Sequence, residues 1–123
     1  MKKILKAIIL TFILVQSAFA QKYNIELVSK NLELNFITTP KRGIEYCKII
    51  YYVEKDLETI SAYKNNTIIW QTNVVSVCGK PKVGKPKIRY IRLNKDKLHV
   101  VIGKHNYAEI DIINGKTEFT GAD

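Results

Sequence analysis

From residue 23 onward, the sequence consists of short stretches of alternating apolar residues separated by turn-forming residues. A period of two is typical of strands, and no segment has the 3.6-residue period of an amphipathic helix. We expect strands at residues 23–28, 32–38, 44–53, 57–63, 68–77, 88–93, 98–102, 108–113 and 116–119. The sequence therefore predicts an all-β fold, an antiparallel meander of about 8–9 short strands that forms two blade-like sheets or a small sandwich.

The breaks between these strands are rich in Gly, Pro, Asn, Asp and Ser, which tolerate the backbone dihedrals of turns. The sharpest signal is Asn114-Gly115. Both central positions of a type I′ turn need a positive φ, and Asn and Gly adopt one at little cost. We therefore expect a type I′ hairpin at this dipeptide.

Two predicted strands, 44–53 and 68–77, are apolar or aromatic almost throughout. Continuous apolar character favours central strands with both faces covered. Trp70 lies in the second of these strands, so we expect it to belong to the core or to cap a sheet and not to stack on a ligand.

Two pairs of segments repeat at a spacing close to 50 residues. Residues 48–55 resemble 97–104, and residues 60–67 resemble 110–117 after a one-residue shift. Each copy predicts a hairpin followed by a turn and another strand. Short strands at such a spacing indicate blade-like repeats.

The stretches 60–70 and 108–116 resemble the blade endings of the PQQ-like β-propeller repeat family. An apolar strand, an Asp-x-x-x-Gly-Lys turn and a strand ending in Trp recur in that family. The first copy has Asn65-Asn66 in place of Gly-Lys, and the second ends in Phe119 instead of Trp. The resemblance covers about half of the chain outside its first 20 residues and implies antiparallel four-stranded units with a scaffold-like role. It brings no cofactor-binding motif.

The first 20 residues have the pattern of a secretory signal peptide. Three lysines precede an apolar run at 7–15, and Ala18-Phe19-Ala20 has the small-x-small form of a cleavage site. The run is too short for a transmembrane anchor, which is the alternative reading. We expect cleavage before Gln21, a single all-β domain at 21–123, a periplasmic or secreted location and no transmembrane helix in the mature chain.

Two cysteines, Cys47 and Cys78, follow the predicted leader. An even number of cysteines in a small exported domain favours a disulfide. They are not spaced as C-x-x-C and have no metal-ligand pattern around them. We therefore expect a Cys47–Cys78 disulfide that joins the two most apolar strands and contributes about 3–4 kcal/mol.

Positive charge is concentrated in residues 80–97, which contain eight Lys or Arg residues and one acid, Asp96. A five-residue unit, Gly-Lys-Pro-Lys followed by Val or Ile, occurs twice at 79–88, and its prolines favour an extended backbone. In the strand that follows, alternation places Ile88 with Tyr90 and Arg92 on one face. The residues that we expect to bind a partner are Lys80, Lys82, Lys85, Lys87, Arg89, Tyr90 and Arg92.

Such a segment suits a polyanionic partner, and the candidates are an anionic glycan, a membrane surface and nucleic acid. A second reading is a charged loop that keeps the protein soluble and protects a sheet edge. The sequence leaves both readings open.

The sequence has no catalytic, metal-binding or cofactor-binding motif. His99 and His105 lack a cysteine or carboxylate at diagnostic spacing, so we expect surface histidines. Glu109 and Asp111 share one face of a strand, where pairing with a lysine such as Lys97 is favoured over a catalytic dyad. We expect no enzyme activity and no cofactor.

These observations indicate an exported, non-enzymatic β domain that binds a partner, possibly polyanionic, through residues 80–97. The alternative is a structural or accessory subunit that uses a sheet edge for protein–protein contact.

Overall fold

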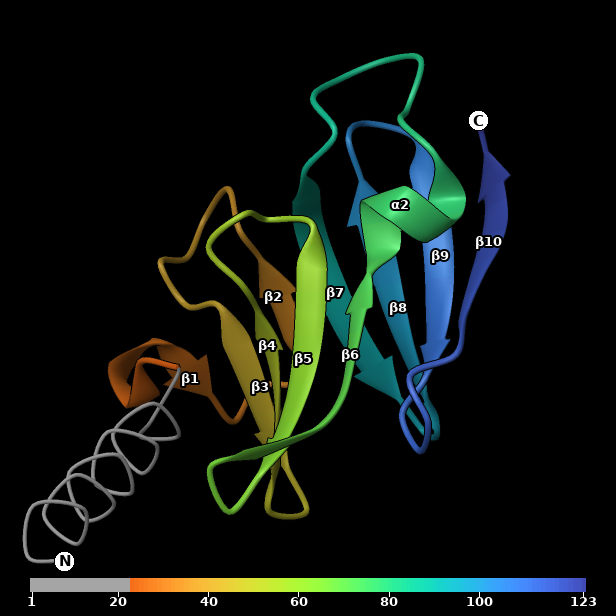
Figure 1. Cartoon of the computed structure of the whole chain (residues 1–123). Coiled ribbons are helices and arrows are strands. Elements are labelled where there is room, and N and C mark those ends of the chain that lie inside the picture. Colours follow the sequence, from red (N-terminus) through yellow and green to blue (C-terminus); the bar gives the residue numbers. More distant parts are fainter. Residues whose placement is uncertain (1–22) are drawn as a thin grey trace, which may run out of the picture.

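The computed structural model describes residues 23–123 (Figure 1), so the predicted leader and cleavage site lie outside the described residues. The described chain forms ten strands in two five-stranded sheets, which confirms the all-β prediction of a sandwich. The elements in chain order are η1 (Ile25–Leu27), β1 (Val28–Ser29), β2 (Glu33–Asn35), β3 (Gly43–Tyr46), β4 (Ile49–Val53), β5 (Thr59–Lys64), β6 (Thr67–Asn73), α2 (Val74–Cys78), β7 (Ile88–Asn94), β8 (Lys97–Ile102), β9 (Asn106–Asp111) and β10 (Thr117–Ala122).

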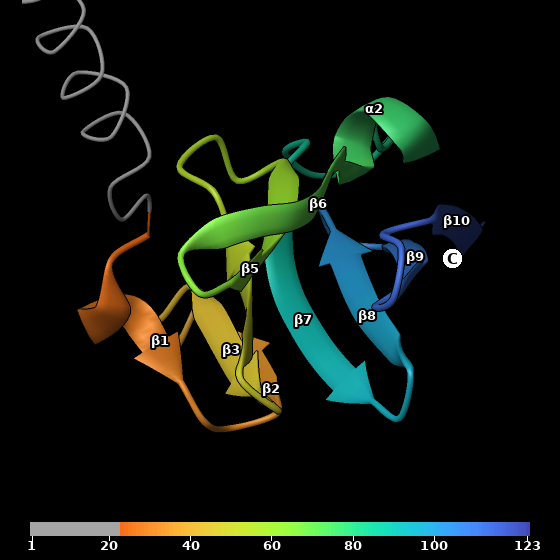
Figure 2. The same cartoon turned by 60° about the horizontal axis from the view of Figure 1, so that its bottom comes forward.

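Each sheet is a four-stranded antiparallel meander with one short N-terminal strand added at its edge. Sheet A has the order β1-β3-β4-β5-β6, and sheet B has the order β10-β9-β8-β7-β2. β1 is parallel to β3, whereas β2 is antiparallel to β7. The N-terminal segment therefore passes from sheet A to sheet B and back, and β1 and β10 lie at far edges of the two sheets (Figure 2).

The core lies between the two sheets and is formed by the inward rows of both. Its buried side chains include Ile44, Tyr51, Val53, Ile60, Ala62 and Trp70 from sheet A, and Leu34, Ile91, Leu93, Leu98, Val100 and Ile110 from sheet B. A smaller cluster of Ile50, Tyr52 and Tyr63 covers the outer face of sheet A, where Tyr23 packs on it. Both faces of β4 and β5 are therefore covered, as the continuous apolar sequence of 44–53 predicts for β4. The same prediction was wrong for 68–77, because β6 is an edge strand and several of its side chains are exposed.

The predicted strand 44–53 is in fact a hairpin, β3 and β4. Cys47 and Lys48 form its two-residue turn, with φ values of 50° and 65°. Two positive φ values in succession are typical of a type I′ turn. The prediction was wrong here because neither residue is a usual choice for these dihedrals.

Two further local predictions were wrong. The strand predicted at 68–77 ends at Asn73, whose side-chain Oδ1 accepts a hydrogen bond of 2.9 Å from the amide of Ser76 and so caps the short helix α2. Near the opposite edge of sheet A, half of the strand predicted at 23–28 is the 3-10 turn η1, and only its last residue, Val28, belongs to a strand.

The predicted type I′ turn at Asn114-Gly115 is also wrong, because only Gly115 of the two has a positive φ, 77°. The Gly115 amide donates a 2.8 Å hydrogen bond to the carbonyl oxygen of Asp111. The Asp111 amide donates a 2.9 Å hydrogen bond to the carbonyl oxygen of Lys116. The turn is therefore longer than two residues. A turn with positive φ at both central residues occurs instead at Asn65-Asn66.

The predicted disulfide is not formed, and both cysteines are free. Cys47 lies in the exposed β3–β4 turn, whereas Cys78 is the last residue of α2 at the opposite end of the sandwich (Figure 1). The prediction failed because the chain reverses at Cys47, which places this residue far from the end of β6. Burial raises the pKa of the Cys78 thiol.

We expect two titratable thiols in the folded, unreduced protein, because the cysteines lie at opposite ends of the molecule. Replacing both by Ser should lower the free energy of unfolding by only about 1 kcal/mol, mainly from Cys78, whereas loss of a disulfide closing this loop would cost about 3–4 kcal/mol. Thiol titration and urea unfolding check this. Absence of any reactive thiol would contradict the expectation.

Trp70 belongs to the core, as predicted, and connects the two sheets. Its side chain is 8% exposed, and its indole Nε1 donates a 2.8 Å hydrogen bond to the carbonyl oxygen of Ile112, just beyond β9. The indole ring lies against Gly115, where a Cβ atom would come within 2.7 Å of ring atoms Cδ2 and Cε3. Glycine is therefore required at 115 both by its φ and by the ring.

Replacing Gly115 by Ala should lower the free energy of unfolding by about 2–5 kcal/mol, because a backbone penalty and a clash with Trp70 add. Gly79 provides the control, since it also has a positive φ, 82°, but nothing lies within 4 Å of its added Cβ. Gly79→Ala should cost only the backbone penalty, about 1–3 kcal/mol. Equal losses for the two variants in urea unfolding would show that the ring contact contributes nothing.

Candidate functional site

The basic segment after α2 is a loop that folds back on the β8–β9 turn. A Cβ atom at Gly84 would lie 2.9 Å from the amide nitrogen of Lys104, and one at Gly103 would lie 3.0 Å from Cγ of Pro81. The Gly103 amide also donates a 2.9 Å hydrogen bond to the carbonyl oxygen of Lys87. The two loops are thus in backbone contact, and the segment is not a free linker.

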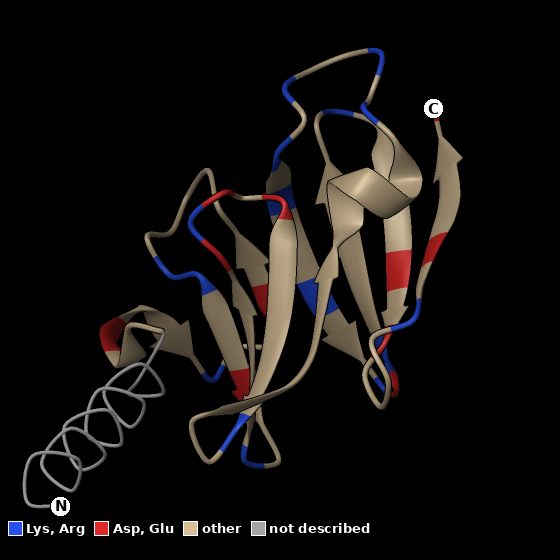
Figure 3. Ribbon diagram, viewed as in Figure 1, with Lys and Arg blue, Asp and Glu red and all other residues tan. Residues whose placement is uncertain are grey.

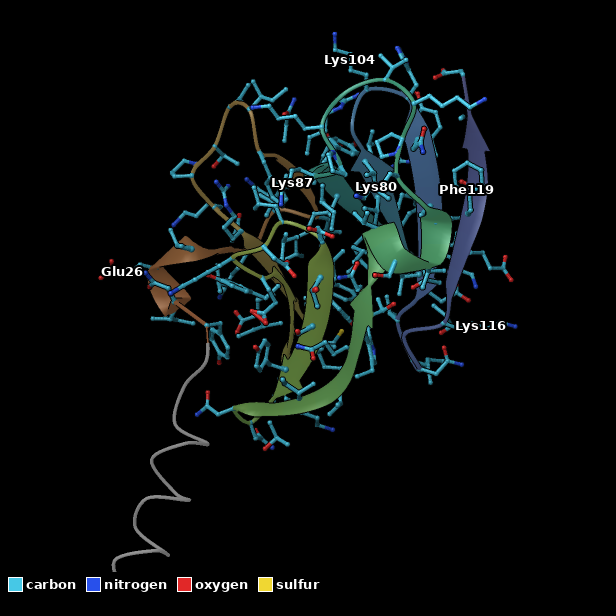
Figure 4. The ribbon with its side chains drawn as sticks, turned by 45° about the horizontal axis from the view of Figure 1, so that its top comes forward. Glu26, Lys80, Lys87, Lys104, Lys116 and Phe119 are labelled. Carbon is cyan, nitrogen blue, oxygen red and sulfur yellow. The ribbon has the colours of Figure 1, made fainter. Side chains whose placement is uncertain are left out.

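This contact gathers lysines from two parts of the chain. Lys80, Lys82 and Lys85 are exposed on the loop after α2, and Lys104 is exposed on the β8–β9 turn. The loop carries blue segments and no red one (Figure 3), and Lys104 lies at the same end as Lys80, whereas Lys116 lies apart from both (Figure 4). We call these four lysines the basic end. Sequence reasoning missed Lys104, which is 17 residues from the predicted segment's last loop lysine, Lys87.

Two predicted contact residues instead support the loops. The Nζ atom of Lys87 donates a 2.8 Å hydrogen bond to the carbonyl oxygen of Asp56 and lies 3.4 Å from Oε2 of Glu58. Arg89 donates through Nε to the carbonyl oxygen of Gly103 and through Nη2, at 2.8 Å, to that of Lys104. These side chains fix the positions of the loops that present the basic end.

The last two predicted contact residues lie on the outer face of sheet B. The β7–β8 register shifts between Ile88 and Tyr90, so that Ile88 points into the core while Tyr90 does not. The prediction that both share a face was wrong because a β-bulge shifts the alternation by one residue. Burial, followed by a hydrogen bond with Glu33, raises the pKa of Tyr90. Arg92 is exposed and lies opposite Glu33 in the β2–β7 register.

A cavity of about 380 Å³ lies at the basic end. Lys80 and Lys82 line it from the loop, and Phe119 lines it from β10 with 47% of its side chain exposed. His105 and Asp123 also line it, with Nδ1 of His105 at 3.1 Å from Oδ1 of Asp123. The cavity therefore combines two ammonium groups with an aromatic ring and one carboxylate that is already paired.

The carboxylates of β9 are paired with basic side chains of β8. Lys97 Nζ lies 3.8 Å from Oδ2 of Asp111, and His99 Nδ1 lies 3.5 Å from Oε1 of Glu109. The predicted pairing of Asp111 with a lysine across the hairpin is therefore confirmed. Within residues 23–123, no three His, Cys, Asp or Glu side chains are grouped so that they could hold a metal ion.

The chain matches no protein-family model, no curated protein and no solved structure. In the part of the chain that the structure describes, no helix is long and apolar enough to cross a membrane.

Arg89→Gln should lower the free energy of unfolding by about 1.5–3 kcal/mol, because Arg89 makes charge-assisted hydrogen bonds to two carbonyl groups. Lys82→Gln is the matched control, since it removes one charge from an exposed side chain and should change stability by less than about 0.5 kcal/mol. Urea unfolding of both variants distinguishes the supporting residue from the exposed one. Equal effects would contradict the supporting role.

Proposed function

We propose that this chain is an exported, non-enzymatic β domain that binds an anionic glycan through the basic end. The observation that carries the proposal is the set of four exposed lysines presented by two loops in backbone contact. Because Arg89 and the close glycines hold these loops, little loop ordering remains to be lost when a ligand binds. Export rests on the leader pattern of the first 20 residues.

The cavity favours a glycan over the other polyanions. A volume of about 380 Å³ admits one sugar unit, which places an acidic group near Lys80 and Lys82 and a C–H face near the ring of Phe119. Single-stranded nucleic acid is usually held by several stacking aromatic side chains, and the cavity wall has one. A bilayer presents an extended surface of charge and would make no use of the cavity.

The charge distribution also supports a localised interaction. The loop at 79–87 contains four lysines and no acid, whereas residues 98–123 carry more acidic than basic side chains. Long-range attraction is therefore directed to one end of the molecule, where it raises the rate of encounter with an anionic polymer.

Replacing Lys82, Lys85 and Lys104 together by Gln should weaken binding to polygalacturonate at least about tenfold and make its salt dependence shallower, because fewer counterions are released. The matched control replaces Lys64, Lys95 and Lys116 by Gln. These residues are also exposed, but they lie at or beside the turns of the opposite end. The control therefore has the same net charge as the first triple variant but keeps the basic end, and it should bind polygalacturonate like the parent protein.

Binding is measured across a series of salt concentrations, with single-stranded DNA and vesicles of phosphatidylglycerol and phosphatidylcholine as competing probes. Equal weakening by the two triple variants would mean that net charge, and not the basic end, determines binding. Preference for DNA or vesicles over polygalacturonate would overturn the glycan assignment. No binding to any probe would leave the lysines as a solubilising surface and favour the sheet-edge accessory role.

A further inference from the structure

The outer face of sheet A contains a second, larger cavity, which we call the sheet A groove. Its volume is about 870 Å³. Tyr23 and its neighbours line it from the N-terminal segment, Glu54 and Lys55 line it from the β4–β5 loop, and Tyr52 and Gln71 line it from β4 and β6. This size lies in the range of pockets that bind small molecules.

The shape of the groove depends on one row of residues across the sheet. Gly43, Tyr52, Ser61 and Gln71 lie opposite one another on β3, β4, β5 and β6. A Cβ atom at Gly43 would lie 2.8 Å from Cδ2 of Tyr52. The ring of Tyr52 therefore packs over Gly43 and does not project into the groove.

Below the groove, a hydrogen-bonded network fixes the polar side chains. Oε2 of Glu54 accepts hydrogen bonds from Ser61 Oγ at 3.0 Å and from the Tyr63 hydroxyl at 2.9 Å. Gln71 Nε2 donates a 2.8 Å hydrogen bond to Ser61 Oγ, and Ser61 is completely buried. Burial, and then the bond to Glu54, raises the pKa of Tyr63, so this hydroxyl remains a donor. Glu54 and Gln71 are thus oriented before any ligand arrives.

The network leaves acceptor atoms for a ligand. Both hydrogen bonds to the Glu54 carboxylate use Oε2, and the Gln71 side chain donates through its nitrogen, so Oε1 of each side chain has no hydrogen bond to another residue in 23–123. Lys55 is exposed at the rim and supplies a donor. The half-buried ring of Tyr23, whose centroid is 4.8 Å from that of Tyr63, supplies an apolar face.

We propose that the sheet A groove binds a neutral carbohydrate. Sugar hydroxyl groups donate to carboxylate and amide oxygens and accept from an ammonium group, while the C–H face of a sugar ring packs on tyrosine. The charges that line the groove balance, since Glu54 and Asp56 are offset by Arg42 and Lys55, so the groove has no net positive charge to attract a polyanion. This site is separate from the basic end and does not depend on the function proposed for it.

The test uses ¹⁵N-labelled protein and three uncharged probes, cellotetraose, maltotetraose and N-acetylchitotriose. We expect at least one probe to shift the side-chain amide resonance of Gln71 and the backbone amides around Glu54 in a saturable way below about 10 mM. Gln71→Ala should weaken this binding about fivefold to tenfold, as loss of one ligand hydrogen bond predicts. Gln71 is exposed, so the variant should still fold.

Glu54→Gln is a second variant. It retains one side-chain oxygen that accepts the hydrogen bonds of Ser61 and Tyr63 but replaces the other oxygen by an NH₂ group, which is a donor. Sugar binding should therefore also weaken about fivefold to tenfold. Lys64→Gln, in β5 but outside the groove, should leave binding unchanged. The triple variant of Lys82, Lys85 and Lys104 should also bind the neutral sugars normally. Absence of shifts with all three probes, shifts confined to the basic end, or shifts caused by a neutral peptide and by no sugar would each overturn the proposal.

Discussion

The sandwich depends on the contact that Trp70 makes across the two sheets. On one side, the N-terminal segment already joins them, because β1 and β3 belong to sheet A and β2 between them belongs to sheet B. On the other side, β6 and β10 are edge strands of different sheets with no ladder between them. The Trp70 indole closes this side by packing on Gly115 and donating to Ile112, so it satisfies its own buried N–H while covering the end of the core.

A second contact of the same kind positions the lysines. Gly84 and Gly103 permit the loop after α2 to approach the β8–β9 turn closely, as Gly115 permits the approach of Trp70. In both places a glycine with positive φ meets a segment that is distant in sequence. The basic end is therefore a product of tertiary packing, because proline-rich sequence alone would give an extended loop with its lysines spread along it.

The sequence predicted what depends on local pattern and missed what depends on distant contacts. Alternation was enough to locate β7 to β10 of sheet B, since recognisable turn residues separate them, whereas β2 covers only part of the strand predicted at 32–38. It failed at Cys47-Lys48, where the chain turns without Gly, Pro, Asn or Asp, and the disulfide prediction failed with it. The bulge after Ile88 places Ile88 and Tyr90 on opposite faces of β7, although alternation predicts that they share one. No pattern in the sequence marks this bulge.

The same distinction separates the residues of the candidate sites. Lys80, Lys82 and Lys85 were found by charge density, whereas Lys104 and the sheet A groove required the fold. Glu54, Ser61 and Gln71 have no motif that relates them, since β-ladder pairing and hydrogen bonds alone bring them together.

The β4–β5 loop connects the supports of the two separate candidate sites. Asp56 lines the groove through this loop, and its carboxylate accepts hydrogen bonds from the amides of Glu58 and Thr59, which fix the loop's shape. Its carbonyl oxygen accepts the hydrogen bond from Lys87, the residue that ends the basic loop. Lys87 therefore acts as a structural link between the wall of one site and the base of the other, which explains why a lysine in the most basic stretch of the chain is turned toward its own protein and not toward a partner.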